Sequence, residues 1–161
     1  MGDQDALQAL AQRCHGKFLA HGWRLAGDKD AAQDIVQQAW TEILRGLPKL
    51  RDDHMFLPWG YRIVTRMTAR WIKRQQKRRL LASTVESEIA PETEADDADV
   101  RITLEQAIAL LPAAQRATLA LFYRESLSIA EISVALDVPL GTVKSRLSHA
   151  REKLRDILER E

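Results

Sequence analysis

Cysteine, glycine and proline are all scarce in this chain of 161 residues. Its single cysteine, Cys14, excludes an internal disulfide, and with His15 and His21 nearby it provides at most a weak partial metal site. We therefore predict no metal site and expect Cys14 to be a buried or half-buried helix residue. With only seven glycines and five prolines, the chain shows helical spacing of apolar residues almost throughout, which predicts an all-α fold.

Long apolar runs are also missing, since no stretch approaches the roughly 18 residues of a membrane span. The first ten residues carry Asp3 and Asp5 and lack the basic and apolar segments of a secretory signal. We therefore expect a cytoplasmic protein without membrane insertion. No glycine-rich phosphate loop, HExxH motif or nucleophile elbow is found, and the histidines are scattered. The sequence predicts neither a catalytic site nor a cofactor.

Charge is nearly balanced overall, at +1, but it is distributed unevenly. Between Trp59 and Arg79 there are eight basic residues and no acidic one. From Ala82 to Val100 the sign reverses, with seven acidic residues and no basic one. A basic helix followed by an acidic stretch that contains a proline is typical of a domain edge and a linker. We predict two small helical domains, residues 1–81 and 101–161, joined by a flexible acidic linker, residues 82–100.

Three helices are predicted in the first domain. Gly27 ends a helix that begins near Gln4, and Asp28 is a candidate N-cap for a second helix that runs to Gly46. The second helix has a core stripe of Val36, Ala39, Trp40, Ile43 and Leu47, and its opposite face carries Asp34, Gln37, Gln38, Thr41 and Arg45. After a polar loop, a third helix has a predicted buried side of Phe56, Gly60, Ile63, Met67 and Trp71.

The second domain is predicted to contain a helix-turn-helix. Two short helices come first, over residues 102–111 and 113–124, with Leu119, Phe122 and Tyr123 as expected core. Ser128 and Glu131 form a capping box that opens a short helix, and Pro139 forces a new helix to begin between residues 139 and 142. This last helix has Val143, Leu147, Ala150, Leu154 and Ile157 on one face.

The opposite face of the last helix suits DNA. In a helix-turn-helix the second helix enters the major groove, where polar side chains read base edges and basic side chains hold phosphates. The candidates for base reading are Lys144, Ser145, Ser148 and His149, and those for phosphate contact are Arg146, Arg151 and Lys153. The alternative is an ordinary solvated face, but the capping box and the turn together favour DNA binding.

A second basic surface is predicted on the third helix, where Arg62, Arg66, Arg70, Arg74 and Arg78 follow one another at four-residue spacing. Like charges at this spacing repel, so a polyanion on the ridge would relieve the repulsion. The alternative partner is the acidic stretch 86–99 folded back on the ridge. Trp59, Tyr61 and Trp71 lie among these arginines and could stack on unpaired bases, although helix aromatics more often pack in a core.

Three stretches of the chain resemble one known family. The stretch LPAAQRATLALFYRESLSIAEISVALDVPLGTVKSRLSHARE, which begins at Leu111, is similar to region 4 of the extracytoplasmic-function (group IV) sigma-70-type sigma factors, including the LS-x-x-EI and GTVKSRL-x-x-ARE signatures. The stretches GDKDAAQDIVQQAW (Gly27 to Trp40) and WGYRIVTRMTARWIKRQQKRR (Trp59 to Arg79) are similar to region 2. Together they cover nearly the whole chain outside the linker.

The resemblance implies a promoter-specificity subunit of bacterial RNA polymerase, with core enzyme and promoter DNA as partners and an anti-sigma factor as a possible regulator. Region 4 would read the minus-35 element through Thr142, Lys144, Ser145, Arg146, Ser148, His149 and Arg151. Region 2 would bind and open the minus-10 element through Arg51, Asp52, Asp53, His54, Phe56, Trp59, Arg62, Arg66, Arg70 and Arg74. It would bind core polymerase through Asp34, Gln37, Gln38 and Thr41.

Region 2 departs from the family pattern at two places. The usual AED-x-x-QE stands here as AQDIVQQ, so that Gln33 and Gln38 replace glutamates, and Arg66 and Arg70 replace a frequent Asn and Asp. The lost acidity leaves open an alternative function, a sigma-like decoy that sequesters an anti-sigma factor without binding polymerase. A plain DNA-binding regulator would need only residues 103–161, and a nucleic-acid-modifying enzyme lacks a candidate active site.

Overall fold

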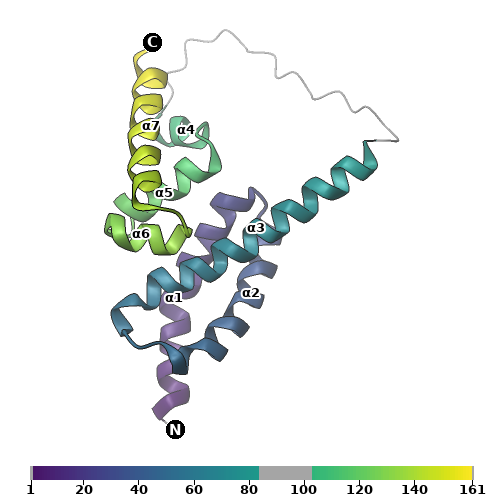
Figure 1. The fold of residues 1–161 in the computed structure, drawn as a ribbon, viewed down its shortest axis with the longest axis vertical. Helices are drawn as coiled ribbons and strands as arrows, with labels where there is room; N and C mark the ends of the chain where they lie inside the picture. The colour runs from purple at the N-terminus through teal and green to yellow at the C-terminus, as the bar shows by residue number, and fades with distance from the viewer. Residues whose placement is uncertain (1, 84–102, 161) are drawn as a thin grey trace.

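The computed structural model describes residues 2–83 and 103–160, and these residues contain helices and no strand. The α-helices are α1 (Gly2–Ala26), α2 (Lys29–Gly46), α3 (Phe56–Ala82), α4 (Leu104–Ala109), α5 (Ala113–Tyr123), α6 (Ile129–Leu136) and α7 (Leu140–Glu159), with short 3-10 turns η1 (Leu47–Lys49) and η2 (Asp53–Met55) (Figure 1). The all-α prediction is confirmed for this part of the chain. Apart from Ala82 and Ser83, the predicted acidic linker lies outside the described residues.

The break between α1 and α2 follows from two neighbouring residues. Gly27 has a φ of +73°, a backbone conformation that costs glycine little, and it ends α1. The Asp28 side chain then accepts a hydrogen bond from the Ala31 N–H at 3.1 Å and caps α2, as the sequence predicted. The two helices are thereby folded back on each other.

The core of the first bundle is built around the Phe18 ring, which is fully buried. Its centroid lies 5.5 Å from that of Trp40, 6.4 Å from that of Phe56 and 5.2 Å from that of Tyr61. A Cβ at Gly60 would overlap the Phe18 ring, so a glycine at this position lets α3 approach α1 closely. Of the predicted α2 stripe, Val36, Ala39 and Ile43 are buried, and Trp40 and Leu47 are half-buried against the same core; Cys14 on α1 is buried.

The buried side of α3 was only partly predicted. Phe56 and Gly60 are buried, but Ile63, Met67 and Trp71 are only half-buried. The fully buried positions one residue further along the helix are Tyr61, Val64 and Thr68. The reason is that α3 packs against α1 and α2 on one side and against α6 on another, so its buried positions are not confined to the single stripe that the spacing suggested.

The second bundle confirms the helix-turn-helix. Ser128 and Glu131 make both hydrogen bonds of the capping box, at 3.1 and 3.0 Å, and open α6. Asp137 ends α6 in the left-handed conformation, with a φ of +56°, and α7 begins after Pro139. The core between α5, α6 and α7 consists of Leu119, Leu121, Ile132, Leu136, Val143, Leu147 and Ala150. Tyr123, which was expected in this core, is instead 59% exposed.

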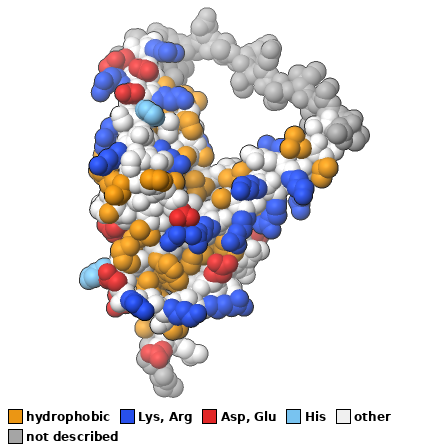
Figure 2. All heavy atoms as spheres, in the orientation of Figure 1, with side chains coloured by type: hydrophobic (Ala, Val, Ile, Leu, Met, Phe, Trp, Pro, Cys, Tyr) orange, Lys and Arg blue, Asp and Glu red, His pale blue; other side chains and the backbone are white. Residues whose placement is uncertain are grey.

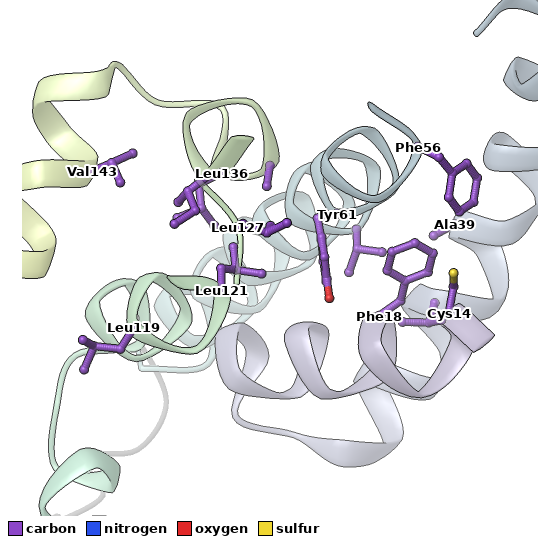
Figure 3. Packing of buried hydrophobic residues seen from close by; sticks show 14 of the residues in the cluster. Cys14, Phe18, Ala39, Phe56, Tyr61, Leu119, Leu121, Leu127, Leu136 and Val143 are labelled. Atoms are coloured by element: carbon purple, nitrogen blue, oxygen red, sulfur yellow. The ribbon is translucent and has the colours of Figure 1, made fainter. Parts of the chain in front are cut away.

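The two bundles touch each other. Helix α6 packs along α3, and α5 packs against α1. Figure 3 shows the apolar side chains of both bundles lying on either side of α3, with Tyr61 between Phe18 and the pair Leu127 and Leu136. The C-terminal half of α3 projects away from the other helices (Figure 1), and its last residues are exposed.

Candidate nucleic-acid and protein interfaces

The predicted reading face of α7 is accessible. Four of its candidate residues are exposed: Lys144, Ser145, Ser148 and His149. Thr142 and Arg146 are half-buried, because they flank the stripe that packs against α5 and α6. The helix thus presents small hydroxyl side chains and a cation on one ridge, which is the chemistry that recognises base edges.

Arg151, a predicted phosphate contact, is held by aromatic residues of α5. Its Nε donates a hydrogen bond to the Tyr123 hydroxyl at 2.9 Å, and its guanidinium lies 5.8 Å from the Phe122 ring centroid and 5.6 Å from that of Tyr123. Tyr123 is therefore a positioning residue for this cation. Sequence reasoning missed it because its apolar spacing on α5 resembles that of a core residue.

The predicted basic ridge of α3 is a continuous exposed surface along most of its length. Figure 2 shows lysine and arginine side chains following α3 outward from the body of the molecule. Arg66, Arg70 and Arg74 are exposed, whereas Arg62 is half-buried where α6 packs on the helix. In the described part of the chain no ion pair involves Arg70, Arg74 or Arg78.

Two arginines of the ridge are already paired with an anion. Arg62 Nη2 lies 3.0 Å from Asp137 Oδ1, and Arg66 Nε lies 3.2 Å from Asp137 Oδ2. One carboxylate, at the turn of the helix-turn-helix, thus bridges two arginines one helical turn apart. The like charges of the ridge predicted an anionic partner, but the sequence did not indicate that Asp137 would be one. The stretch 86–99, the alternative partner, lies outside the described residues.

A buried histidine lies where α1, α3 and α6 meet. His21 is fully buried, and its Nε2 lies 2.9 Å from Thr65 Oγ1. The Thr65 hydroxyl lies within hydrogen-bond distance of two carbonyl oxygens, of Tyr61 at 2.7 Å and of Ala135 at 2.9 Å. Because this hydroxyl has a single proton to donate to a carbonyl, the His21 Nε2–H donates to its oxygen. Burial, assisted by the charge of Arg24, lowers the pKa of His21 to about 3.

Two further polar contacts join α1 to the second bundle. Lys17 Nζ lies 3.2 Å from Glu125 Oε2, and Arg116 Nη2 donates to the Arg24 carbonyl at 3.3 Å. Burial, with the Glu125 carboxylate as the next cause, raises the pKa of Tyr61 above its ordinary range. The joint between the bundles therefore combines apolar packing with several hydrogen bonds.

The predicted minus-10 loop, residues 50–56, is exposed at its tip. Arg51, Asp52, Asp53 and His54 are all exposed, and the Asp52 carboxylate accepts a hydrogen bond from the His54 N–H at 3.0 Å. Phe56 is buried in the core, and Trp59 is half-buried against Gly46. The rings of these two residues pack together at the C-terminal end of the loop, with centroids 6.2 Å apart.

A recess of about 640 Å³ lies beside this loop, between it and α1. Its walls include Leu10, Cys14, Leu50 and Phe56, and Arg13 and Lys17 contribute positive charge. Burial raises the pKa of the Cys14 thiol, which therefore stays protonated. Among the residues that the structure describes, no three His, Cys, Asp or Glu side chains gather as a metal site would require.

The predicted polymerase-binding residues share one exposed face of α2. Asp34, Gln37, Gln38 and Thr41 are all exposed on the side opposite the buried stripe, and so is Gln33. The helix packs through its core stripe, so this face is available to a protein partner. No described helix is long and apolar enough to cross a membrane.

The comparisons with known proteins match both halves of the chain to one family. Residues 10–78 match the family model of sigma-70 region 2, and residues 101–154 match that of sigma-70 region 4. The RNA polymerase sigma-H factor of Pseudomonas aeruginosa is 32% identical, over 98% of this chain and 89% of its own length. The ECF RNA polymerase sigma-E factor of Escherichia coli K12 is 31% identical, over 95% of this chain and 86% of its own.

A solved structure has the same fold. The sigma factor RpoE of Bartonella quintana, crystallised in complex with the anti-sigma factor NepR, gives a TM-score of 0.74 at 19% identity, over 96% of this chain and 97% of that chain. The fold, the order of the two matched regions and the identity to relatives over nearly their full length agree. The chain therefore belongs to the sigma-70-type sigma factors of bacterial RNA polymerase, within the extracytoplasmic-function group.

Proposed function

We propose that this chain directs core polymerase to its promoters in the cytoplasm, with residues 1–81 acting on core enzyme and the minus-10 element and residues 101–161 on the minus-35 element. The sigma factors of its family serve transcription initiation and have no catalytic activity of their own, which supports this proposal. The observation that carries this proposal is the presence of both polar surfaces, on α3 and on α7, in one chain. A plain DNA-binding regulator needs only the second of them.

In this proposal α7 reads the minus-35 element. Ser145, Ser148 and His149 would contact base edges, whereas Arg151, oriented by Tyr123, would hold a phosphate. We expect Ser148→Ala or His149→Ala to change which bases are preferred, and Arg151→Ala to weaken binding about equally for all sequences. The test is a binding titration against single-base variants of a selected element. If every protein mutant loses the same affinity for all single-base DNA variants, α7 does not read the bases and another surface must do so.

The exposed loop tip and the ridge of α3 would bind the minus-10 region. Arg51, Asp52, Asp53 and His54 are accessible for base contacts, and Arg62, Arg66, Arg70 and Arg74 would follow the backbone of the opened strands. Phe56 and Trp59 would act indirectly, by holding the C-terminal end of the loop in place. Loss of one phosphate contact, as in Arg70→Ala, is expected to lower the salt slope of log affinity by roughly 0.7 to 0.9.

The α2 face would bind core polymerase. We expect Asp34→Arg to reduce co-purification of core enzyme without changing thermal stability, because the side chain is exposed and makes no core contact. Thr41→Ala on the same face is a milder companion, and Asp156→Arg, at an exposed position of α7, serves as the matched charge-reversal control. If Asp34→Arg captures as much core enzyme as the parent, this face is not part of the polymerase interface.

One observation favours the second candidate, the decoy. Gln33 and Gln38 are exposed on the α2 face where the family usually carries glutamates. Run-off transcription with purified core enzyme over a randomised promoter pool separates the two functions, since a decoy yields no promoter-dependent transcript. If the glutamines only tune affinity, Gln33→Glu with Gln38→Glu increases polymerase binding.

A further inference from the structure

The contact between Asp137 and the α3 ridge places a carboxylate where the proposed function requires a phosphate. Its two oxygens lie 3.0 Å from Arg62 Nη2 and 3.2 Å from Arg66 Nε. Guanidinium groups bind carboxylates and phosphates through the same N–H donors, in the same fork geometry. Arg62 and Arg66 therefore cannot offer these donors to DNA while Asp137 occupies them.

We propose that Asp137 acts as an internal substitute for a promoter phosphate and latches the helix-turn-helix onto α3 in the free chain. In this closed state the N-terminal half of the ridge is withheld from DNA, and promoter binding requires the latch to open. The proposal rests on the proposed function of the ridge in DNA binding. It adds a competition between two anions, one within the chain and one on the promoter, for the same pair of arginines.

The rest of the joint supports a specific closed state. Helix α6 packs along α3, and the Thr65 hydroxyl reaches the Ala135 carbonyl at 2.9 Å near the end of α6, where carbonyls lack partners within the helix. Leu136 and Leu127 add apolar contact beside Tyr61 (Figure 3). The position of the turn relative to α3 is thus defined by the contacts of the residues that precede Asp137 as well as by its two ion pairs.

The two ion pairs of the latch are nevertheless weak. The side chains of Arg62, Arg66 and Asp137 are 37%, 52% and 45% exposed, so water and salt screen both ion pairs. Exposed pairs of this kind change an equilibrium by about 1.5- to 5-fold each. A promoter that presents several phosphates to the whole ridge can therefore displace a single carboxylate.

The latch acts on the ridge and leaves the reading face of α7 accessible. Lys144, Ser145, Ser148 and His149 are all exposed in the closed state. Opening is therefore expected to raise affinity for forked DNA that carries the minus-10 region and to leave affinity for a minus-35 duplex unchanged. This difference separates release of the ridge from a general gain in attraction to DNA.

The first experiment measures the distance between the bundles in the full chain without DNA. Spin labels are attached at Glu42→Cys on α2 and Arg155→Cys on α7, in a Cys14→Ala background, and the distance distribution is recorded by electron paramagnetic resonance. Asp137→Asn is the test variant, because asparagine tolerates the left-handed conformation and removes only the charge. We expect its open-to-closed ratio to rise by about 2- to 30-fold over the parent.

Matched controls distinguish the latch from a general charge effect. Asp156→Asn removes the same charge from an exposed site on α7, and Arg70→Gln removes an arginine one turn beyond the latch, so both are expected to give the parent distribution. Arg66→Gln is expected to open the chain, and combining it with Asp137→Asn adds less than the sum of the two single effects. Identical distributions for the parent, Asp137→Asn and Arg66→Gln would overturn the proposal.

The second experiment measures binding of full-length chain with core enzyme to a forked minus-10 DNA and to a minus-35 duplex. Asp137→Asn is expected to tighten binding to the fork about 2- to 30-fold and Asp156→Asn to leave it unchanged. Equal gains on both DNAs, or none on the fork, would also overturn the latch. The proposed function is tested separately. It fails if the parent chain gives no promoter-dependent transcript with core enzyme, and this result does not depend on the distance measurements.

Discussion

The stability of the protein is expected to fall steeply in mildly acidic solution because of His21. In the folded chain this imidazole is fully buried, with Thr65 beside its Nε2, and its pKa is about 3. In the unfolded chain its pKa returns to about 6.5. Between these two pKa values the unfolded state binds a proton that the folded state does not. The contribution of His21 to the free energy of unfolding is therefore fully present above pH 6.5 and is lost as the pH falls.

The magnitude follows from the linkage relation. Each pH unit between the two pKa values costs about 1.4 kcal/mol, and lowering the pH from 7 to 5 therefore removes about 2 kcal/mol from the free energy of unfolding. That is a large part of the roughly 5 to 15 kcal/mol that stabilises a typical domain. Most carboxylates titrate below pH 5, so the titration of His21 dominates the change in the free energy of unfolding between pH 7 and pH 5.

The assay is urea unfolding at pH 7, 6 and 5, followed by circular dichroism at fixed ionic strength. His21→Gln retains a donor for the Thr65 hydroxyl and cannot be protonated, so its stability is expected to change by less than about 0.5 kcal/mol over the same range. His149→Gln, at an exposed position of α7, is the control and should keep the parent's slope. A parent and a His21→Gln variant with equal pH slopes would refute the reasoning.

Local packing gives two more predictions. Gly60→Ala is expected to lower the free energy of unfolding by about 1 to 3 kcal/mol, because the new methyl group overlaps the buried Phe18 ring. The control, Gly16→Ala, meets no atom within 4 Å and should stabilise the helix by up to about 1 kcal/mol, so equal effects would contradict the close approach of α3 to α1. Ser128→Ala removes the cap of α6 and is expected to cost about 1 kcal/mol in urea unfolding, and an unchanged midpoint would mean that the cap contributes nothing.

Local sequence signals determined most of the secondary structure. The left-handed Gly27, the Asp28 cap and the capping box of Ser128 and Glu131 act within four residues of themselves, so they could be recognised without tertiary information. The apolar stripes of α2 and α7 were also predicted correctly, because each of these helices packs through one continuous face. The polar faces opposite them, which carry most of the proposed polymerase and minus-35 contacts, follow directly from those stripes.

Only the tertiary structure decided how α3 is used and what its arginines contact. Its sequence has apolar residues on more than one side, and periodicity cannot say which side meets α1 and which meets α6. The pairing of Arg62 and Arg66 with Asp137 joins residues 70 or more positions apart, as does the hydrogen bond from Thr65 to Ala135. Such contacts depend on how the two bundles pack, since a pattern of residues along one helix carries no information about the charge that another helix brings to it.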